Sequence, residues 1–203
     1  MLDVNFKSGF FTLMFTAFAM NVVNANAAEQ NSTYVGKVNY EGSACPKGSV
    51  KVSLKDSKSN LSVSFRDYSI LAKGRNVRGT RKSCSIAIAL HVPKGWSLSL
   101  VNARYSGSLA IPAGAQGKLV NTYSFSGKRG NSYKVNFNGP RIQNFQLRDS
   151  LSSFASVWSH CGKKTVLRIN SSMRVKSADS GNESAAESSQ NFETKLRFRR
   201  CYK

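Results

Sequence analysis

Polar and apolar residues alternate one by one along most of the chain, the pattern of strands with one buried face. Only Leu147 to Ser159 fits a short helix, and it fits a loop followed by an edge strand equally well. Glycine and proline fall between the alternating stretches, where turns are expected. The stretches that predict strands are Ser49 to Leu54, Leu61 to Phe65, Ser85 to Val92, Trp96 to Tyr105, Leu119 to Phe125, Tyr133 to Phe137, Thr165 to Lys176 and Phe192 to Cys201.

The pattern predicts an all-β fold, an antiparallel two-sheet β-sandwich of about eight to ten strands. A parallel sheet would need crossover helices, for which there is no periodicity. In the stretch from Ser85 to Val92, isoleucine, leucine and valine occupy one face, and small residues with His91 occupy the other. The small face suggests that another layer approaches closely, so we expect a central strand rather than an edge.

Residues 1–27 resemble a secretory signal peptide. Lys7 precedes an apolar run from Phe10 to Val23, and Ala25-Asn26-Ala27 provides a cleavage site. A membrane anchor is the alternative, but about 14 helical residues rise only about 21 Å, short of a hydrocarbon core of roughly 30 Å. We therefore expect a secreted, or periplasmic or extracellular, protein whose single domain covers residues 28–203, without a transmembrane segment after cleavage.

The four cysteines are Cys45, Cys84, Cys161 and Cys201. An even number in an exported chain favours two disulfides. Three connectivities are possible, and we prefer Cys45 with Cys84 and Cys161 with Cys201, because each pair then joins neighbouring segments. A zinc site is the competing interpretation, disfavoured because no two cysteines have CxxC spacing and the chain has two histidines. We expect neither a metal nor a cofactor.

The charge is strongly unbalanced, with 30 Lys and Arg against 10 Asp and Glu, a formal net charge of +20. No acidic residue occurs between Asp67 and Asp149, although thirteen basic residues do. A charge run is usually a solvated face balanced by nearby carboxylates. Here the carboxylates are too few for that, so the sequence indicates an anionic partner.

Two predicted strands, Lys164 to Lys176 and Phe192 to Cys201, are apolar on one face and cationic on the other. The acidic, Ser-rich segment 178–190 between them is interpreted as a mobile hairpin loop. If the two strands pair through this loop, their cations merge into one basic surface, with like charges across from one another. The alternative is that the acidic loop folds back and neutralises that surface.

A second cationic cluster occupies the glycine-containing loop from Lys73 to Lys82. Flexible backbone with guanidinium groups suits a polyanion, although a solubilising linker fits equally well. Trp96 and Trp158 lie in apolar patterns and are interpreted as core residues.

Catalytic signatures are weak. The sequence contains no GxSxG, HExxH, P-loop, Rossmann or EF-hand pattern. His91 and His160 are interpreted as structural, and Asp67 as an ion-pair partner of Arg66. A glycosidase would need paired carboxylates, which Asp67 with Asp56 or Asp149 could supply only if the fold brings them together.

Several motifs occur in order along the mature chain. They are Cys45 to Val50, Arg81 to Ile88, Val92 to Trp96, Tyr105 to Gly107, Thr122 to Gly127, Gly139-Pro140, Trp158 to Cys161 and Leu196 to Cys201. With these motifs the chain resembles the small secreted proteins grouped as domain of unknown function 4360. This resemblance spans nearly the whole mature chain and implies an exported, single-domain, cysteine-containing protein, known from fungi and bacteria, with no established activity. It implies no catalytic residue.

The leading hypothesis is a non-enzymatic exported protein whose basic surface binds an anionic polymer: envelope polysaccharide, lipopolysaccharide or extracellular nucleic acid. The alternative is a secreted cell-wall or polysaccharide hydrolase using Asp67 and His91. A third hypothesis, disruption of anionic membranes, lacks an amphipathic helix. The binding residues that we predict are Arg75, Arg78, Arg81, Lys82, Arg168, Arg174, Lys195, Arg197 and Arg199.

Overall fold

The structure is a computed structural model, which describes residues 33–72, 79–126, 128, 130–151, 157–162, 164–177 and 185–202. Within these residues eleven strands form two sheets. The strands are β1 (Tyr34–Glu41), β2 (Val50–Lys55), β3 (Asn60–Phe65), β4 (Ser69–Ala72), β5 (Thr80–His91), β6 (Trp96–Ile111), β7 (Gln116–Phe125), β8 (Asn131–Asn138), β9 (Arg141–Asp149), β10 (Thr165–Lys176) and β11 (Ala185–Arg200).

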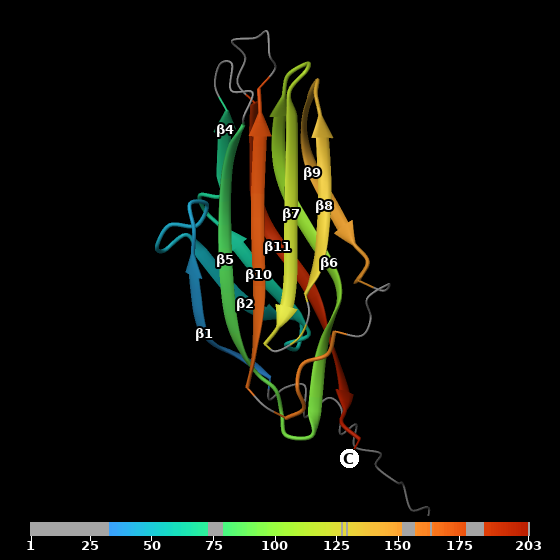
Figure 1. The fold of residues 1–203 in the computed structure, drawn as a ribbon. Helices are drawn as coiled ribbons and strands as arrows, with labels where there is room; N and C mark the ends of the chain where they lie inside the picture. The colour runs from blue at the N-terminus through green and yellow to red at the C-terminus, as the bar shows by residue number, and fades with distance from the viewer. Residues whose placement is uncertain are drawn as a thin grey trace, which may run out of the picture.

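The sheets pack as a sandwich. Sheet A has the order β1-β5-β10-β7-β8, and sheet B has the order β2-β3-β11-β6-β9, with β4 also paired to β11. Neighbouring strands are antiparallel throughout (Figure 1). The predicted all-β, antiparallel two-sheet sandwich is therefore confirmed, with one strand more than the largest number expected.

Three strands, β1, β4 and β9, were not predicted. The helix considered for Leu147 to Ser159 is wrong at its start, because residues 147–149 continue β9. Near its end, Trp158 forms an isolated antiparallel bridge with Ser99 of β6. The bridge at Trp158 agrees better with the alternative of a loop followed by an edge strand than with a helix. Residues 152–156 lie outside the described part.

The inward face of each strand builds one core between the sheets. Sheet A contributes Ile86, Ile88 and Leu167, and sheet B contributes Leu61 and Phe192, all 2% exposed or less. Burial of these apolar side chains is the main driving force for the sandwich.

Strand β5 is central in sheet A, between β1 and β10, as predicted. The expected third layer over its small face is not found among the described residues. Ala87 and Ala89 are instead half-buried on the outer face, where a Cβ on Gly36 of β1 would lie 3.6 Å from that of Ala89. The small side chains therefore accommodate a neighbouring strand, not a covering layer.

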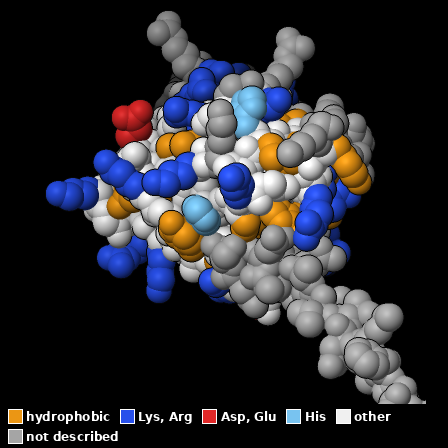
Figure 2. Space-filling model, turned by 90° about the horizontal axis from the view of Figure 1, so that it is seen from below, with side chains coloured by type: hydrophobic (Ala, Val, Ile, Leu, Met, Phe, Trp, Pro, Cys, Tyr) orange, Lys and Arg blue, Asp and Glu red, His pale blue; other side chains and the backbone are white. Residues whose placement is uncertain are grey.

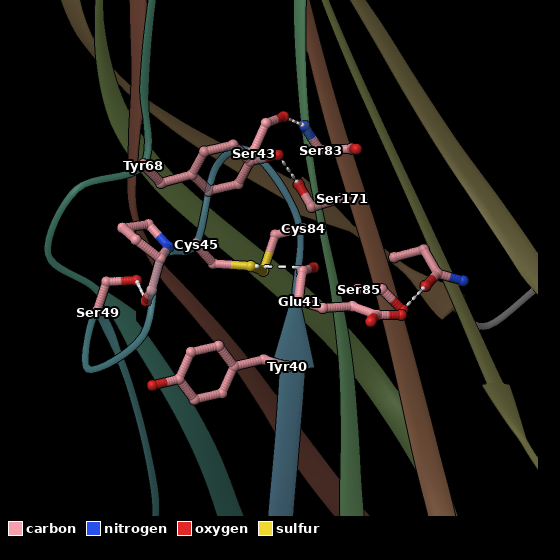
Figure 3. Close-up of a disulfide and its surroundings, with 12 residues drawn as sticks. Tyr40, Glu41, Ser43, Cys45, Ser49, Tyr68, Ser83, Cys84, Ser85 and Ser171 are labelled. Atoms are coloured by element: carbon pink, nitrogen blue, oxygen red, sulfur yellow. Dashed lines mark hydrogen bonds between the residues drawn. A yellow bond between two sulfur atoms is a disulfide. The ribbon is translucent and has the colours of Figure 1, made fainter.

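Both preferred disulfides are present. Cys45 joins Cys84 at a Cα separation of 5.5 Å, and Cys161 joins Cys201 at 6.1 Å. Figure 3 shows how the first fastens the loop after β1 to β5. The Ala44 amide donates to the Ser83 carbonyl at 3.0 Å, and the Ser83 amide donates to the Ser43 hydroxyl at 3.2 Å.

The expected hairpin between the two cationic strands is wrong. Residues 185–190, assigned to a loop running from 178 to 190, begin β11, and residues 178–184 lie outside the described part. Strand β10 (orange in Figure 1) belongs to sheet A, whereas β11 (red) pairs with β3, β4 and β6 in sheet B. Alternation shows which face of a strand is apolar, but not which strand lies beside it.

Among the described residues, the structure contains no helix with the length and apolar character needed to cross a membrane. The signal-peptide prediction for residues 1–27 lies outside the described part.

Candidate functional site

The outer face of sheet A carries three cations side by side. Arg81 of β5 lies directly across from Arg174 of β10, and Arg174 lies across from Lys118 of β7. All three side chains are exposed. Like charges directly opposite on neighbouring strands cost a few tenths of a kcal/mol or more per pair. We call this row of residues the cationic row.

Arg81 of the cationic row is hydrogen-bonded to the neighbouring strand. Its Nε–H donates to the Ser172 hydroxyl of β10 at 2.9 Å. A guanidinium carries five N–H donors, so this bond uses one of the donors of Arg81.

A neutral polar strip continues from the cationic row along the same face. Ser85 of β5, Asn170 of β10 and Thr122 of β7 occupy neighbouring positions on adjacent strands, and Glu41 of β1 flanks Ser85 at the sheet edge. The Ser85 hydroxyl donates to the Asn170 side-chain carbonyl at 2.7 Å. Figure 3 shows the Glu41 side chain directed toward Ser85. Hydroxyl, amide and carboxylate groups can all exchange hydrogen bonds with a polyhydroxylated ligand.

The polar strip and Arg81 of the cationic row border a hollow of about 570 Å³, which is lined by Glu41, Arg81, Ser85, Thr122 and Asn170 among others. Beyond the strip lies exposed Arg168, on the same face of β10 as Arg174. The two arginines are six positions apart, roughly 20 Å along the strand. The face therefore has cations at both ends and neutral polar groups between them, with the acidic side chain of Glu41 at the edge of the sheet.

Sheet B carries a different cluster, near the end of β11. The guanidinium carbons of Arg197 and Arg199 lie over the ring of Trp158, at 5.1 and 4.0 Å from its centroid. We call these three residues the tryptophan–arginine cluster. Each stacked pair contributes about 0.5–1 kcal/mol at exposed positions. Lys195 lies on the same side of β11, beside a groove of about 450 Å³ that also contains Asp56 and Glu193.

The segment that carries Trp158 is held rigidly. The Ser159 amide donates to the Leu98 carbonyl at 2.8 Å, and the Leu98 amide donates to the Ser159 hydroxyl at 3.0 Å. Ser97 donates to the Ser159 carbonyl at 2.7 Å, and the disulfide at Cys161 follows two residues later.

The structure does not bring the predicted binding residues onto one surface. Arg81, Arg168 and Arg174 face outward from sheet A, whereas Lys195, Arg197 and Arg199 face outward from sheet B. Because β10 and β11 lie in opposite sheets, the expected merging of their cations into one basic surface is wrong. In the end-on view of Figure 2, Lys and Arg project from several sides, whereas acidic side chains are visible at one edge.

Two further groups of predicted residues fall elsewhere. Lys82 is half-buried and shares the side of β5 that carries Cys84 and Ile86, opposite to Arg81. Arg75 and Arg78 lie outside the described residues.

The candidate catalytic pair is not assembled. Tyr68, which follows Asp67, donates to the Ser171 hydroxyl at 2.7 Å, and Ser171 is paired with Cys84. His91 lies seven residues beyond Cys84 along β5, roughly 23 Å away. It stacks on Tyr34 with ring centroids 4.6 Å apart, and Asp67 is exposed. In the described residues, no group of three or more His, Cys, Asp or Glu could hold a metal ion.

A buried tyrosine network lies between the sheets. The hydroxyls of Tyr105 and Tyr123 are hydrogen-bonded, and Tyr123 donates to Asp149 at 3.0 Å. Burial raises the pKa of both tyrosines well above the usual range, and the negative charge of Asp149 adds to this rise. Burial also raises the pKa of Asp149, opposed by the hydrogen bond from Tyr123. The network is internal and adds no accessible reactive group to either outer face.

Sequence reasoning missed Lys118, the polar strip and the role of Trp158. The predicted strand began at Ser85, and Arg81 and Lys82 were assigned to a loop, whereas β5 begins at Thr80 and carries Arg81 and Ser85 on one face. The register across β5, β10 and β7 then places Ser85 in line with Asn170 and Thr122. Trp96 is buried in the core, as interpreted from the sequence, but the same interpretation is wrong for Trp158. Trp158 is half-buried, does not belong to the hydrophobic core and has two arginines over its ring.

Comparison with known proteins identifies relatives in sequence. A family model described as "Domain of unknown function (DUF4360)" matches residues 30–201. An "Uncharacterized secreted protein" from Arthroderma benhamiae is 31% identical over 156 residues. The match covers 76% of this chain and 64% of that relative, so the chain spans less than two thirds of the relative's length.

The similarity to solved structures is more distant. TmCBM61, solved in complex with beta-1,4-galactotriose, is 14% identical over 82% of this chain and 90% of its own, with a TM-score of 0.30. A Family 11 Carbohydrate-Binding Module from Clostridium thermocellum is 10% identical over 80% of this chain and 86% of its own, with a TM-score of 0.25. Scores this low support no conclusion about a ligand.

The secreted relative and the two disulfides agree with an extracellular location. With the family model matching nearly the whole described chain, the protein is a secreted member of the DUF4360 family.

Proposed function

We propose that this protein binds an acidic polysaccharide outside the cell, through the outer face of sheet A. The observation that supports this most directly is the cationic row, in which Arg81, Arg174 and Lys118 occupy neighbouring positions on three strands. An arrangement of like charges opposes folding unless an anion or another group neutralises it. Guanidinium groups match the planar geometry of carboxylate and sulfate anions.

The polar strip favours a polysaccharide over a nucleic acid. Ser85, Asn170 and Thr122 offer donors and acceptors suited to sugar hydroxyls. Proteins that bind single-stranded nucleic acid stack bases on aromatic side chains. The described outward positions of β5, β10 and β7 contain no Phe, Tyr or Trp. The aromatic pair of His91 and Tyr34 lies at the other end of β5, ten positions from Arg81 of the cationic row.

Titration calorimetry with polygalacturonate tests this proposal. The wild-type protein is expected to bind polygalacturonate and not neutral dextran. The triple variant Arg81→Gln/Arg168→Gln/Arg174→Gln is expected to bind at least about tenfold more weakly, since each lost charged contact is worth about 1 kcal/mol or more.

A matched control removes the same number of charges from turns and a sheet edge. Lys37→Gln/Lys47→Gln/Lys128→Gln changes three exposed lysines outside the cationic row and should retain most of the affinity. Equal weakening by both triple variants would contradict a defined site, because it would show that only net charge matters. Tighter binding of single-stranded DNA than of polygalacturonate would contradict the choice of polysaccharide.

A further inference from the structure

The two cationic clusters lie on opposite outer faces of the sandwich. Sheet A presents Arg81, Arg168 and Arg174, and sheet B presents Arg197 and Arg199. Packed sheets are about 10 Å apart, and the outer side chains extend away from that core. A stiff polymer chain lying along one face therefore does not reach the other.

The tryptophan–arginine cluster is built as an anion site. The guanidinium carbons of Arg197 and Arg199 lie 5.1 and 4.0 Å from the centroid of the Trp158 ring, so one indole ring holds two cationic groups close together. The N–H bonds of a guanidinium group lie in its plane. Those in-plane donors are the ones that pair with carboxylate or sulfate oxygens.

The cluster is also restrained before any anion arrives. The hydrogen bonds of Ser159 and the disulfide at Cys161 fix the segment beneath the indole ring. The indole ring in turn restrains two long side chains, which lowers the entropy cost of ordering them on binding. Loosely held surface arginines would not have this advantage.

We infer that the tryptophan–arginine cluster is a second anionic-polysaccharide site, and that one molecule thereby bridges two polymer chains. This inference rests on the proposed function, because the first chain occupies sheet A. It extends the proposed function in two ways: sheet B carries a separate site, and the protein crosslinks polysaccharide chains.

Light scattering from dilute, long-chain polygalacturonate mixed with the protein tests the inference. With the wild-type protein, the scattering mass is expected to rise to several times that of one polymer chain. The variant Arg197→Gln/Arg199→Gln is expected to bind within about threefold of wild type while the scattering mass stays near that of a single decorated chain.

Two further variants distinguish a specific effect of the tryptophan–arginine cluster from a general effect of net charge. Lys47→Gln/Lys128→Gln loses the same charge at exposed turn positions and should crosslink as wild type does. Trp158→Leu keeps the net charge and should weaken crosslinking, because it removes the ring over which both arginines are stacked.

The outcomes are distinguishable. Failure of the wild-type protein to bind polygalacturonate would overturn the proposed function. Binding without growth in scattering mass, or full crosslinking by Arg197→Gln/Arg199→Gln, would overturn the bridging alone.

Discussion

At the scale of single residues, burial determines the chemistry of the tyrosine network. Tyr105 is 3% exposed and Tyr123 is equally buried, and both remain protonated in the fold because a buried phenolate is poorly solvated. In the unfolded chain, tyrosines ionise near pH 10. Protons are therefore released on unfolding above that pH, so stability falls as the pH rises.

Replacing Tyr105 by Phe is expected to make this alkaline loss less steep. Each buried tyrosine adds about 1.4 kcal/mol per pH unit to the loss above about pH 10, and Tyr105→Phe removes one such contribution. At neutral pH the variant loses about 1 kcal/mol with its hydrogen bond to Tyr123. Urea unfolding at pH values between about 9 and about 11.5 measures both effects.

Tyr202→Phe, at a side chain that is 95% exposed, is the matched control for removing a phenol hydroxyl. An alkaline slope in Tyr105→Phe as steep as in the wild-type protein would contradict the buried origin of the effect.

At the scale of elements, Gly42 allows β1 to turn sharply onto β5. Its φ is +134°, and an added Cβ would lie 2.2 Å from the Ser83 carbonyl oxygen. Backbone strain of this kind costs on the order of 1–3 kcal/mol, and the steric clash adds to it. Gly42→Ala is therefore expected to destabilise the protein by about 3 kcal/mol or more, measured as a lower urea midpoint.

Gly48 provides the comparison within the same loop region. Its φ is +86°, but nothing lies within 4 Å of an added Cβ. Gly48→Ala should cost only about 1–2 kcal/mol, the price of a left-handed conformation. A loss as large as that of Gly42→Ala would contradict the role of the close contact at Ser83.

Removing either disulfide should lower the free energy of unfolding by a similar amount, but only removal of the Cys161–Cys201 disulfide should change the tryptophan fluorescence. Their sequence separations are 39 and 40, so the chain-entropy model gives each a similar contribution, about 4 kcal/mol. Cys161→Ser/Cys201→Ser is expected to lose that amount and also to change tryptophan fluorescence, because Trp158 lies on the segment anchored by Cys161. Cys45→Ser/Cys84→Ser should lose similar stability with native fluorescence unchanged, and the reverse pattern would contradict this assignment.

The sequence predicts a strand well when the alternation of polar and apolar residues is long, but it does not predict which strands pair. Strand β10 was predicted with its observed bounds, because a long alternating run is a local signal. The strands that pair with β11 were not predicted, because register and sheet membership depend on contacts between segments that are distant in the sequence. Short strands such as β4 and the polar, mostly exposed strand β9 give too weak an alternation to be recognised.

At the scale of the whole molecule, the positive charge is distributed over both outer faces of one sandwich. Composition predicted the excess and the need for an anionic partner. The distribution depends on sheet topology, so only the fold separates Arg174 on sheet A from Arg197 on sheet B. The surface thus has two separate cationic clusters in place of the single basic surface expected.

The central claim, that the outer face of sheet A binds an acidic polysaccharide through ion contacts, is tested most directly by the salt dependence of binding. The association constant for polygalacturonate is measured between about 50 and about 500 mM NaCl, for the wild-type protein and for Arg81→Gln/Arg168→Gln/Arg174→Gln. We expect log K to fall linearly with log salt concentration, and to fall less steeply in the variant because fewer counterions are released. An association constant independent of salt, or an identical slope in both proteins, would contradict the claim.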